Sequence, residues 1–258
     1  MDIYQHFRSE ERPFIDQVME WKADVSMQYT WKRTDFLDPR EQEIVDALVG
    51  RNDDVSVSFW GGSEHAERKR ACLIPPYLEL AEEDYGLTLF ELSYPKKFLT
   101  IDHRQVLGAC MSLGVKREKF GDILVADERI QLVVATEIAE FVRLHLTSVG
   151  KAQVEMVELG FEQMLVTTES WHERTATVSS LRLDAVIGEM LSLSRAKAAE
   201  LVEKGRVKVN WKLVESGALT LHAGDHISVR GFGRHKLLEV EGKTKKDKFR
   251  LRIGRMGH

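Results

Sequence analysis

The sequence of 258 residues is 43% hydrophobic and 30% charged, with a formal net charge of −4 at pH 7. At about 100 to 200 residues per domain, this length predicts two or three domains, and the composition is typical of a globular protein with substantial apolar cores. The two cysteines, Cys72 and Cys110, lie far apart and form no CxxC pattern, which does not favour a disulfide framework or a zinc site.

No segment of the chain has the pattern of a signal peptide or a membrane span. The N-terminal stretch MDIYQHFRSEERPF lacks an apolar core, and no apolar run approaches the roughly 18 residues that a membrane-spanning helix needs. We therefore expect a cytoplasmic protein with reduced thiols and no membrane partner.

The charge is divided unequally along the chain. Residues 175–258 carry 17 Lys and Arg against 9 Asp and Glu, a net charge of +8, whereas residues 1–174 carry a net charge of −12. Opposed halves indicate either a C-terminal part that meets a polyanion or domains that attract each other through their charges.

Helical spacing dominates the first 50 residues. An apolar stripe spans residues 14–21, and a second helix is predicted over residues 39–49, ending at Gly50. Residues 55–60 alternate as a strand does, and a short charged helix is expected at residues 64–70.

A glycine pair, Gly61-Gly62, precedes that charged helix and the triplet Arg68-Lys69-Arg70. Free amides at the start of the helix could bind a phosphate group. The same residues are equally compatible with a tight turn followed by a solvated helix, so both interpretations stay open.

From residue 87 the pattern becomes regular. We predict strands at residues 87–94, 121–127, 129–136 and 152–159, and helices at residues 104–113 and 138–148. The order βαββαβ is typical of the ferredoxin-like or RNA-recognition-motif fold. The RNA-recognition form stacks bases on aromatic residues of its central strands, and residues 129–136 contain none, so we expect this fold without its usual stacking surface.

Several cations of this front half lie in predicted loops or at a helix start, where they could extend a phosphate-tracking surface. They are Arg68, Lys69, Arg70, Arg104, Lys116, Arg117 and Lys119.

Between Ser180 and Lys236 the pattern predicts two short helices packed on a few short strands. The second helix begins after Ser194, whose hydroxyl can accept a hydrogen bond from a first-turn amide, and it ends at Gly205. Strands are predicted at residues 207–210 and 226–230.

The polar positions of this segment are unusually often Arg or Lys, which predicts a basic face that contacts RNA. The residues expected on it are Arg182, Ser194, Arg195, Lys197, Lys204, Arg206, Lys208, Lys212, Arg230, Arg234 and Lys236. The alternative is an ordinary solvated helix face. A last predicted strand in the tail places Arg250 and Arg252 opposite its apolar side chains, either as phosphate contacts or as the charges of an edge strand.

Four pieces of this segment form a combined pattern: Arg182-Leu183-Asp184, Ser194-Arg195 with Ala198, Lys204-Gly205-Arg206-Val207-Lys208-Val209-Asn210, and Gly224-Asp225. The pattern resembles the RNA-binding domain first described in small-subunit ribosomal protein four, which we call the S-four domain. Many members have glycine after the asparagine, where this chain has Trp211, so the resemblance leaves the shape of that hairpin tip open.

The front half carries a second resemblance. The stretch GG-x-x-x-AERKR, the stretch Ile101-Asp102-His103-Arg104 with Leu107-Gly108, and the stretch from Leu113 to Asp122 resemble the bacterial YlmH-type proteins, which join such a front part to an S-four domain. The resemblance implies an RNA-binding, ribosome-associated protein linked to the rescue of stalled large subunits that carry peptidyl-tRNA.

The sequence contains no recognisable catalytic constellation. The only RLD motif is part of the S-four pattern, Gly61-Gly62 is too short for a cofactor-binding turn, and neither HIGH-like nor KMSKS-like residues of a tRNA synthetase occur. His222 and His226 flank a turn, which does not favour a metal site. We expect no enzyme activity, no cofactor and no metal.

We therefore expect an α+β protein with an N-terminal α/β region (1–80), a ferredoxin-like domain (81–170) and an S-four domain with a basic tail (175–258). The expected partners are structured RNA, namely ribosomal RNA and also tRNA, and the large ribosomal subunit; the free protein is expected to be a monomer. Two alternatives stay open: an RNA-modifying enzyme of the pseudouridine synthase or methyltransferase class, and a protein-interaction adaptor.

Overall fold

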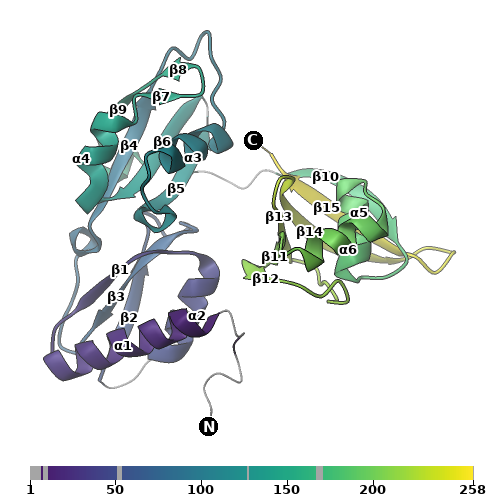
Figure 1. Ribbon diagram of the computed structural model, residues 1–258, viewed down its shortest axis with the longest axis horizontal. Helices are drawn as coiled ribbons and strands as arrows, with labels where there is room; N and C mark the ends of the chain where they lie inside the picture. Colours follow the sequence, from purple (N-terminus) through teal and green to yellow (C-terminus); the bar gives the residue numbers. More distant parts are fainter. Residues whose placement is uncertain (1–6, 8–10, 51–53, 127, 167–170, 258) are drawn as a thin grey trace. The chain divides into compact units, whose positions relative to one another are not determined.

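The chain divides into two compact units, Met1–Thr167 and Thr168–His258 (Figure 1). The computed structural model describes residues 7, 11–50, 54–126, 128–166 and 171–257. Most of the N-terminal stretch 1–14, in which we expect no signal peptide, therefore lies outside the described residues. Within these residues, every helix is too short or too polar to cross a membrane.

The first lobe of the front unit, residues 11–78, is a three-stranded antiparallel sheet covered by two helices. Its elements are α1 (Arg12–Gln28), β1 (Lys32–Leu37), α2 (Pro39–Val49), β2 (Ser56–Trp60) and β3 (Lys69–Ile74), with the strand order β1-β3-β2. The two predicted helices are confirmed. Asp38 and Glu41 cap the start of α2 reciprocally, and Gly50 ends it with a φ of 61° that glycine adopts without strain.

Two predictions in this lobe are wrong. Strand β1 was not predicted, because its first four residues are polar and only Phe36 and Leu37 give an apolar signal. Residues 64–70 form no helix, since the amides of Glu67 and Arg68 donate to Asp122 at 2.7 and 3.0 Å instead of joining a helical ladder.

The second lobe, residues 81–166, has the predicted ferredoxin-like topology. Its elements are β4 (Leu87–Ser93), α3 (His103–Ser112), β5 (Phe120–Ala126), β6 (Arg129–Ala135), α4 (Thr136–His145), β7 (Ser148–Val149), β8 (Ala152–Gln153) and β9 (Glu155–Leu159), with short 3₁₀ turns at η3 (Glu82–Tyr85), η4 (Arg117–Lys119) and η5 (Phe161–Gln163). The main sheet is antiparallel in the order β5-β6-β4-β9 (Figure 1). The βαββαβ prediction is therefore confirmed.

The end of this lobe differs from the prediction. Helix α4 stops at His145, three residues early, and the expected strand 152–159 is split between β8 and β9. A turn at Gly150, with a φ of 59°, folds residues 148–153 into a two-stranded hairpin that local periodicity did not reveal. Asp127, the predicted last residue of another strand, lies outside the described residues.

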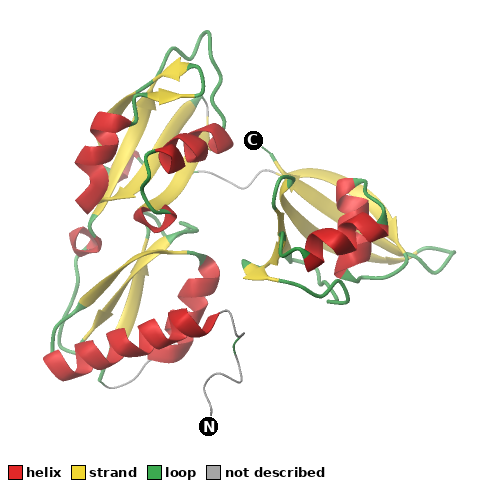
Figure 2. Cartoon of the chain, viewed as in Figure 1, coloured by secondary structure: helices red, strands yellow, loops and turns green. Residues whose placement is uncertain are grey.

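The C-terminal unit is a six-stranded antiparallel sheet with two helices on one side of it (Figure 2). Its elements are β10 (Trp171–Val178), α5 (Leu183–Leu191), α6 (Arg195–Glu203), β11 (Val207–Val209), β12 (Lys212–Leu213), β13 (His226–Val229), β14 (Gly233–Lys243) and β15 (Phe249–Met256). The helix pair and the strands at residues 207–210 and 226–230 are confirmed.

The sheet is larger than predicted. Strands β10 and β14 were missed, and β15 lies between them in the order β10-β15-β14-β13-β11-β12. The interpretation of the tail as an edge strand is therefore wrong, because β15 has a hydrogen-bonded neighbour on each side.

Candidate RNA-binding surface

A buried carboxylate lies in the first turn of α5. The side chain of Asp184 is 8% exposed and accepts hydrogen bonds from Arg182 at 3.0 Å and Arg195 at 3.3 Å. Burial alone would raise the pKa of Asp184, but the hydrogen bonds from the two guanidinium groups outweigh it and lower that pKa. The two arginine side chains are 42% and 56% exposed. Asp184 thus holds two cations at the surface.

The loop before β13 seats this carboxylate. The amides of Leu183 and Asp184 donate to the carbonyls of Leu219 and Gly217, at 2.8 and 3.1 Å. A side chain at Gly217 would meet the Cβ of Asp184 at 3.1 Å, so the glycine permits this close approach. The start of α5 is therefore held by a segment that follows it by more than thirty residues.

Helix α6 presents further cations beside this pair. Its N-cap is Ser194, whose Oγ accepts from the amide of Lys197 at 3.3 Å, so the predicted capping role is confirmed. Lys197 is exposed, Lys204 pairs with Glu200 one turn earlier, and Arg206 is exposed just after the helix. We call the following group the helix-side cations: Arg182, Arg195, Lys197, Lys204 and Arg206.

The cations of the strands lie on the other side of the same sheet. Strands β11 and β14 bury alternate residues against the helices, so the residues between them point away. These outward residues include Lys208, Arg234 and Lys236. We call this side, which also carries His226 of β13, the outer sheet face. The structure thus divides the predicted basic face between two sides of the domain.

The remaining predicted contacts of this domain lie at its edges. Arg230 is exposed directly after β13, and Lys212 is partly exposed in the edge strand β12. On β15, Arg250 pairs with Glu241 at 3.2 Å. Arg252 pairs with Glu239 at 2.6 Å, so the two tail arginines share their charge with neighbouring carboxylates.

The seven candidate cations of the front unit fall into two groups. Arg104 at the start of α3 and Lys116 before η4 are exposed. Lys69 is partly exposed and donates to the carbonyl of Glu64 at 2.8 Å. The other four cations make contacts within the protein, at the junction of the two lobes.

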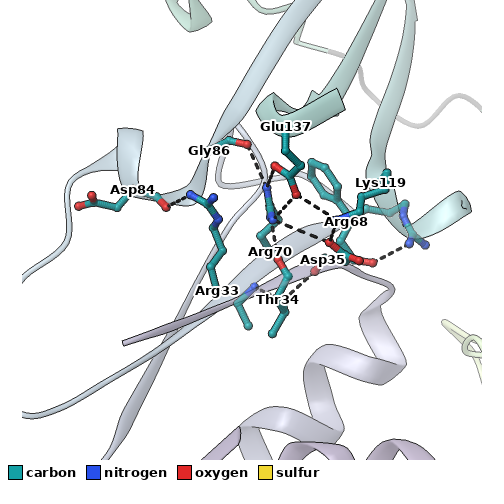
Figure 3. A network of polar contacts seen from close by, with 11 residues as sticks. Arg33, Thr34, Asp35, Arg68, Arg70, Asp84, Gly86, Lys119 and Glu137 are labelled. Atoms are coloured by element: carbon teal, nitrogen blue, oxygen red, sulfur yellow. Dashed lines mark hydrogen bonds and ion pairs between the residues drawn. The ribbon is translucent and has the colours of Figure 1, made fainter. Parts of the chain in front are cut away.

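Arg70 is the centre of that junction (Figure 3). Its side chain is 3% exposed and donates to the carbonyl of Thr34 at 2.7 Å and to that of Gly86 at 3.1 Å. It also makes a two-pronged ion pair with Glu137 at 2.9 and 3.0 Å. Because Thr34 belongs to the first lobe and Glu137 to the second, Arg70 joins the two lobes.

Arg68 and Lys119 reinforce the same junction, whereas Arg117 donates within the second lobe. Arg68 is 9% exposed and donates to the carbonyls of Phe36 and Phe120, at 2.8 and 3.1 Å. Lys119 donates to Asp35 of the first lobe at 2.5 Å and to Glu137 of the second lobe at 3.1 Å. Arg117 donates to the carbonyl of Phe120 at 2.6 Å, and burial lowers its pKa to about 10. Their donors are directed to protein acceptors.

Glu137 is the carboxylate that Arg70 and Lys119 share. Burial alone would raise the pKa of Glu137, but the hydrogen bond and charge of Arg70, with Lys119, lower it to about 2. The carboxylate is therefore ionised throughout the neutral range.

The structure also bears on the glycine pair before this triplet. The amides of Glu67 and Arg68, which could have bound a phosphate, are held by the carboxylate of Asp122. A side chain at Gly61 would meet the carbonyl of Arg68 at 2.4 Å, which explains the need for glycine there. Of the two interpretations, the turn fits this geometry.

The sheet of the second lobe is covered on both faces. Helices α3 and α4 pack on one face, while Leu89 and Val133 of the central strands pack against Phe36 of the first lobe on the other. Gln131, fully buried, accepts from the amide of Leu165 at 2.7 Å and donates to the carbonyl of Gln163 at 3.0 Å. The face on which RNA-recognition motifs stack bases is therefore occupied by the protein's own chain.

Metal and thiol chemistry find little support in the part of the chain that the structure describes. Within it, no group of three His, Cys, Asp or Glu side chains could hold a metal ion. Burial raises the pKa of Cys72 to about 12 and that of Cys110 to about 11, so both thiols stay protonated at neutral pH.

Two carboxylates that organise these cations were missed at the level of sequence. Asp184 stands in the RLD motif between two candidate positions, and its place in the first turn of a predicted helix could have drawn attention to it. Nothing in the local sequence of Glu137 indicates its role, since its partners lie 67 and 18 residues away.

Models of three protein families match the chain. The matches are "YlmH, N-terminal" over residues 10–78, "Putative RNA-binding domain in YlmH" over residues 81–163 and "S4 domain", our S-four domain, over residues 181–227. The chain thus carries two RNA-binding domains by family.

Two known proteins are similar to most of the chain. "Ribosome-associated protein quality control protein P2" of Bacillus subtilis (strain 168) is 49% identical over 254 residues, which cover 98% of both chains. The solved structure "Cell division protein ylmH from Streptococcus pneumoniae" is 32% identical with a TM-score of 0.55 and covers 64% of this chain and 99% of its own.

Proposed function

Because the chain belongs to the YlmH family, we propose that it is a non-catalytic protein that binds structured RNA of the large ribosomal subunit during ribosome-associated quality control. The ligand is ribosomal RNA together with the tRNA of a stalled subunit. The name of the relative in Bacillus subtilis states ribosome-associated quality control, which supports that setting. The free protein acts as a monomer in the cytoplasm.

The observation that carries this proposal is the orientation of the cluster at Asp184. The carboxylate is buried, and the side chains of Arg182 and Arg195 that donate to it are each about half exposed. Guanidinium groups with this freedom can bridge phosphate oxygens, which fix the position of a protein on RNA without reading its bases. The other helix-side cations extend the same contact along the backbone.

A-form RNA suits such a surface. Its deep major groove is closed to side chains, so proteins recognise it by its shape and by its phosphates and 2′-hydroxyls. A short helix flanked by cations at both ends, as α6 is by Arg195 and Arg206, matches that mode of recognition.

Charge reversal of Arg195 and Arg206 tests the proposal. The double variant Arg195→Glu/Arg206→Glu should lose RNA affinity by more than about tenfold and show a salt slope reduced by about 1 to 2. Binding is measured by co-sedimentation with large subunits that carry peptidyl-tRNA and with subunits that do not, across a salt series. Lys151→Glu, at the exposed turn between β7 and β8, is the matched control. An unchanged salt slope in the double variant would refute the assignment of this surface.

The rival function, an RNA-modifying enzyme, makes a different prediction. Mass spectrometry of ribosomal RNA and tRNA from cells that lack the protein would then reveal a missing modification. We expect an unaltered set of modified nucleotides, because binding alone changes no covalent bond.

A further inference from the structure

Three aromatic rings lie in a row at the outer sheet face. The ring of His226 contacts that of Trp171 edge-on, with 5.7 Å between centroids, and that of Trp211 in a tilted arrangement at 5.2 Å. All three side chains are partly exposed. We call these residues the aromatic row. The helix-side cations do not include any of them, so the row is a separate feature of the domain.

The alternation of the strands explains why the row lies there. Gly254 of β15 is paired with Lys236 of β14 and with Glu173 of β10. Trp171 lies two residues before Glu173, so it stands on the same side of the sheet as Lys236. A side chain at Gly254 would meet the ring of Trp171 at 3.1 Å. The glycine thus gives Trp171 room to lie across the sheet instead of standing away from it.

The third ring is held in a strained position. Trp211 has a φ of 61° and Asn210 a φ of 48°, the two positive angles of a tight hairpin turn whose second residue is usually glycine. A bulky residue rarely adopts such a φ, because its Cβ crowds the backbone. This turn is the one at which the S-four resemblance left the hairpin tip open. The turn has the backbone angles that usually require glycine, and it carries a tryptophan there at a conformational cost.

Hydrogen bonds hold the turn beside His226. The side chain of Asn210 accepts from the amide of His226 at 2.9 Å and donates to Asp225 at 2.8 Å. The amide of Asn210 donates to the carbonyl of His226 at 2.8 Å. These contacts place Trp211 next to the ring of His226. A strained residue that its surroundings hold in place is a common mark of a functional position.

Positive charge accompanies the row. The ammonium group of Lys236 lies 5.7 Å above the centroid of Trp171, a cation–π contact, and Lys208 and Arg234 stand on the same side of the sheet. Apart from the partly exposed Leu238, the aliphatic side chains of β11, β13 and β14 point the other way, into the core beneath the helices. Aromatic rings surrounded by cations suit a ligand that has both planar groups and negative charge, such as a nucleic acid. They suit an apolar peptide less well.

From this arrangement we propose that the aromatic row of the outer sheet face binds unstacked bases of single-stranded RNA, with Lys236, Lys208 and Arg234 near the phosphates. Bases of any identity stack on aromatic rings, which gives affinity without sequence preference. The inference rests on the RNA-binding function proposed above and deepens it. The domain binds duplex RNA through the helix-side cations, and it binds an adjoining single-stranded segment through the aromatic row.

The substitution Trp211→Gly tests this proposal without endangering the fold. Glycine adopts a positive φ without strain, so the variant should unfold at the same denaturant concentration as the wild type or at a higher one. Binding to a fluorescent ten-nucleotide oligoadenylate should weaken by about tenfold, the scale of one lost base stack. The salt slope should stay unchanged, because the substitution removes no cation.

A second variant controls for a change in the conformation of the turn. Trp211→Asn also suits a left-handed backbone conformation and should reproduce the loss of oligoadenylate binding. Trp171→Phe keeps an aromatic ring on the sheet and should lose less affinity than Trp171→Leu. This difference separates stacking from mere filling of space.

An RNA hairpin without single-stranded ends separates this proposal from the proposed function. Trp211→Gly should leave hairpin binding unchanged, whereas Arg195→Glu/Arg206→Glu should weaken it. If the tryptophan variants bind oligoadenylate like the wild type, the row has no role in RNA binding and the inference fails. A loss of ribosome co-sedimentation with oligoadenylate binding intact would also overturn it and point to a protein partner on this face. If Arg195→Glu/Arg206→Glu binds the hairpin like the wild type while the tryptophan variants lose oligoadenylate binding, the proposed function fails and the inference about the aromatic row stands.

Discussion

Glu137 in the front unit and Asp184 in the S-four domain each pair with two cations, but the burial of the partners is reversed between the two clusters. At the lobe junction the cation Arg70 is 3% exposed and the carboxylate Glu137 is 36% exposed. In the S-four domain the carboxylate Asp184 is 8% exposed, and Arg182 and Arg195 are 42% and 56% exposed.

This difference separates cations that hold a fold together from cations that can meet a ligand. A buried guanidinium group needs protein acceptors for its donors, and Arg70 finds them in two carbonyls and a carboxylate. An exposed guanidinium group held by one carboxylate keeps donors for a phosphate. The same residue types therefore serve two purposes, and burial decides which.

Removal of Arg70 should have the largest effect on stability. Arg70→Met leaves Glu137 without its main partner and two carbonyls without their donor, so we expect a loss of about 3 kcal/mol or more in the unfolding free energy. Denaturant unfolding of the full chain measures it, with the exposed Arg104→Met as the control of similar chemistry. A loss as small as that of the control would mean that the junction does not depend on this ion pair.

Asp184→Asn should have an intermediate effect on stability, and the direction of its effect on RNA affinity distinguishes charge from position. Loss of two charge-assisted hydrogen bonds should reduce the unfolding free energy by about 2 kcal/mol. The substitution makes the domain more positive, so charge alone would strengthen RNA binding. We expect a severalfold weaker binding instead, because Arg182 and Arg195 lose their anchor. Fluorescence anisotropy with an RNA hairpin measures the change, and stronger binding would show that position does not matter.

The pH dependence of the front unit should show the contribution of Glu137. The pKa of Glu137 is lowered from an ordinary 4.5 to about 2 in the folded protein, so the unfolded state binds more protons between these values. Its stabilising effect is complete above about pH 4.5 and disappears as the pH falls toward 2. The difference in unfolding free energy between the wild type and Glu137→Gln should shrink over this range. A constant difference would assign the effect to something other than charge.

The exposed pair on α6 should give the smallest effect. Glu200 pairs with Lys204 one turn later, at a site where both side chains are more than half exposed. Glu200→Gln should leave the unfolding midpoint within error, because exposed pairs contribute little. It removes a negative charge beside the helix-side cations, so RNA affinity at low salt should rise by about twofold. Equilibrium binding in a salt series tests this, and a decrease would show that the pair positions Lys204.

The parts of the fold that sequence predicted are those set by neighbouring residues. The cap of α6 at Ser194 and the helix end at Gly50 depend on hydrogen bonds and backbone angles within one turn. The order βαββαβ follows from periodicity within each segment. Strands β10 and β14 were missed because only one face of each packs on the core. For β10 the partner strand β15 also lies more than seventy residues away in the sequence.

The candidate site was predicted only in part for the same reason. The motif around Arg182 and Arg195 identified the S-four domain, and both residues lie where a phosphate could reach them. The triplet Arg68-Lys69-Arg70 had the same composition and was interpreted as surface. Its acceptors at Thr34 and Phe120 are 36 and 52 residues away, a relation that no local pattern contains.

The sequence by itself determined the family, the order of most elements and the charge of each half, because these depend on residue identity and short-range spacing. Tertiary structure decided which cations face inward, which face of the second lobe is covered and how the basic residues of the S-four domain divide between two sides of one sheet. The physical reason is that a buried charge must find its acceptors, and those acceptors come together only when distant strands pair.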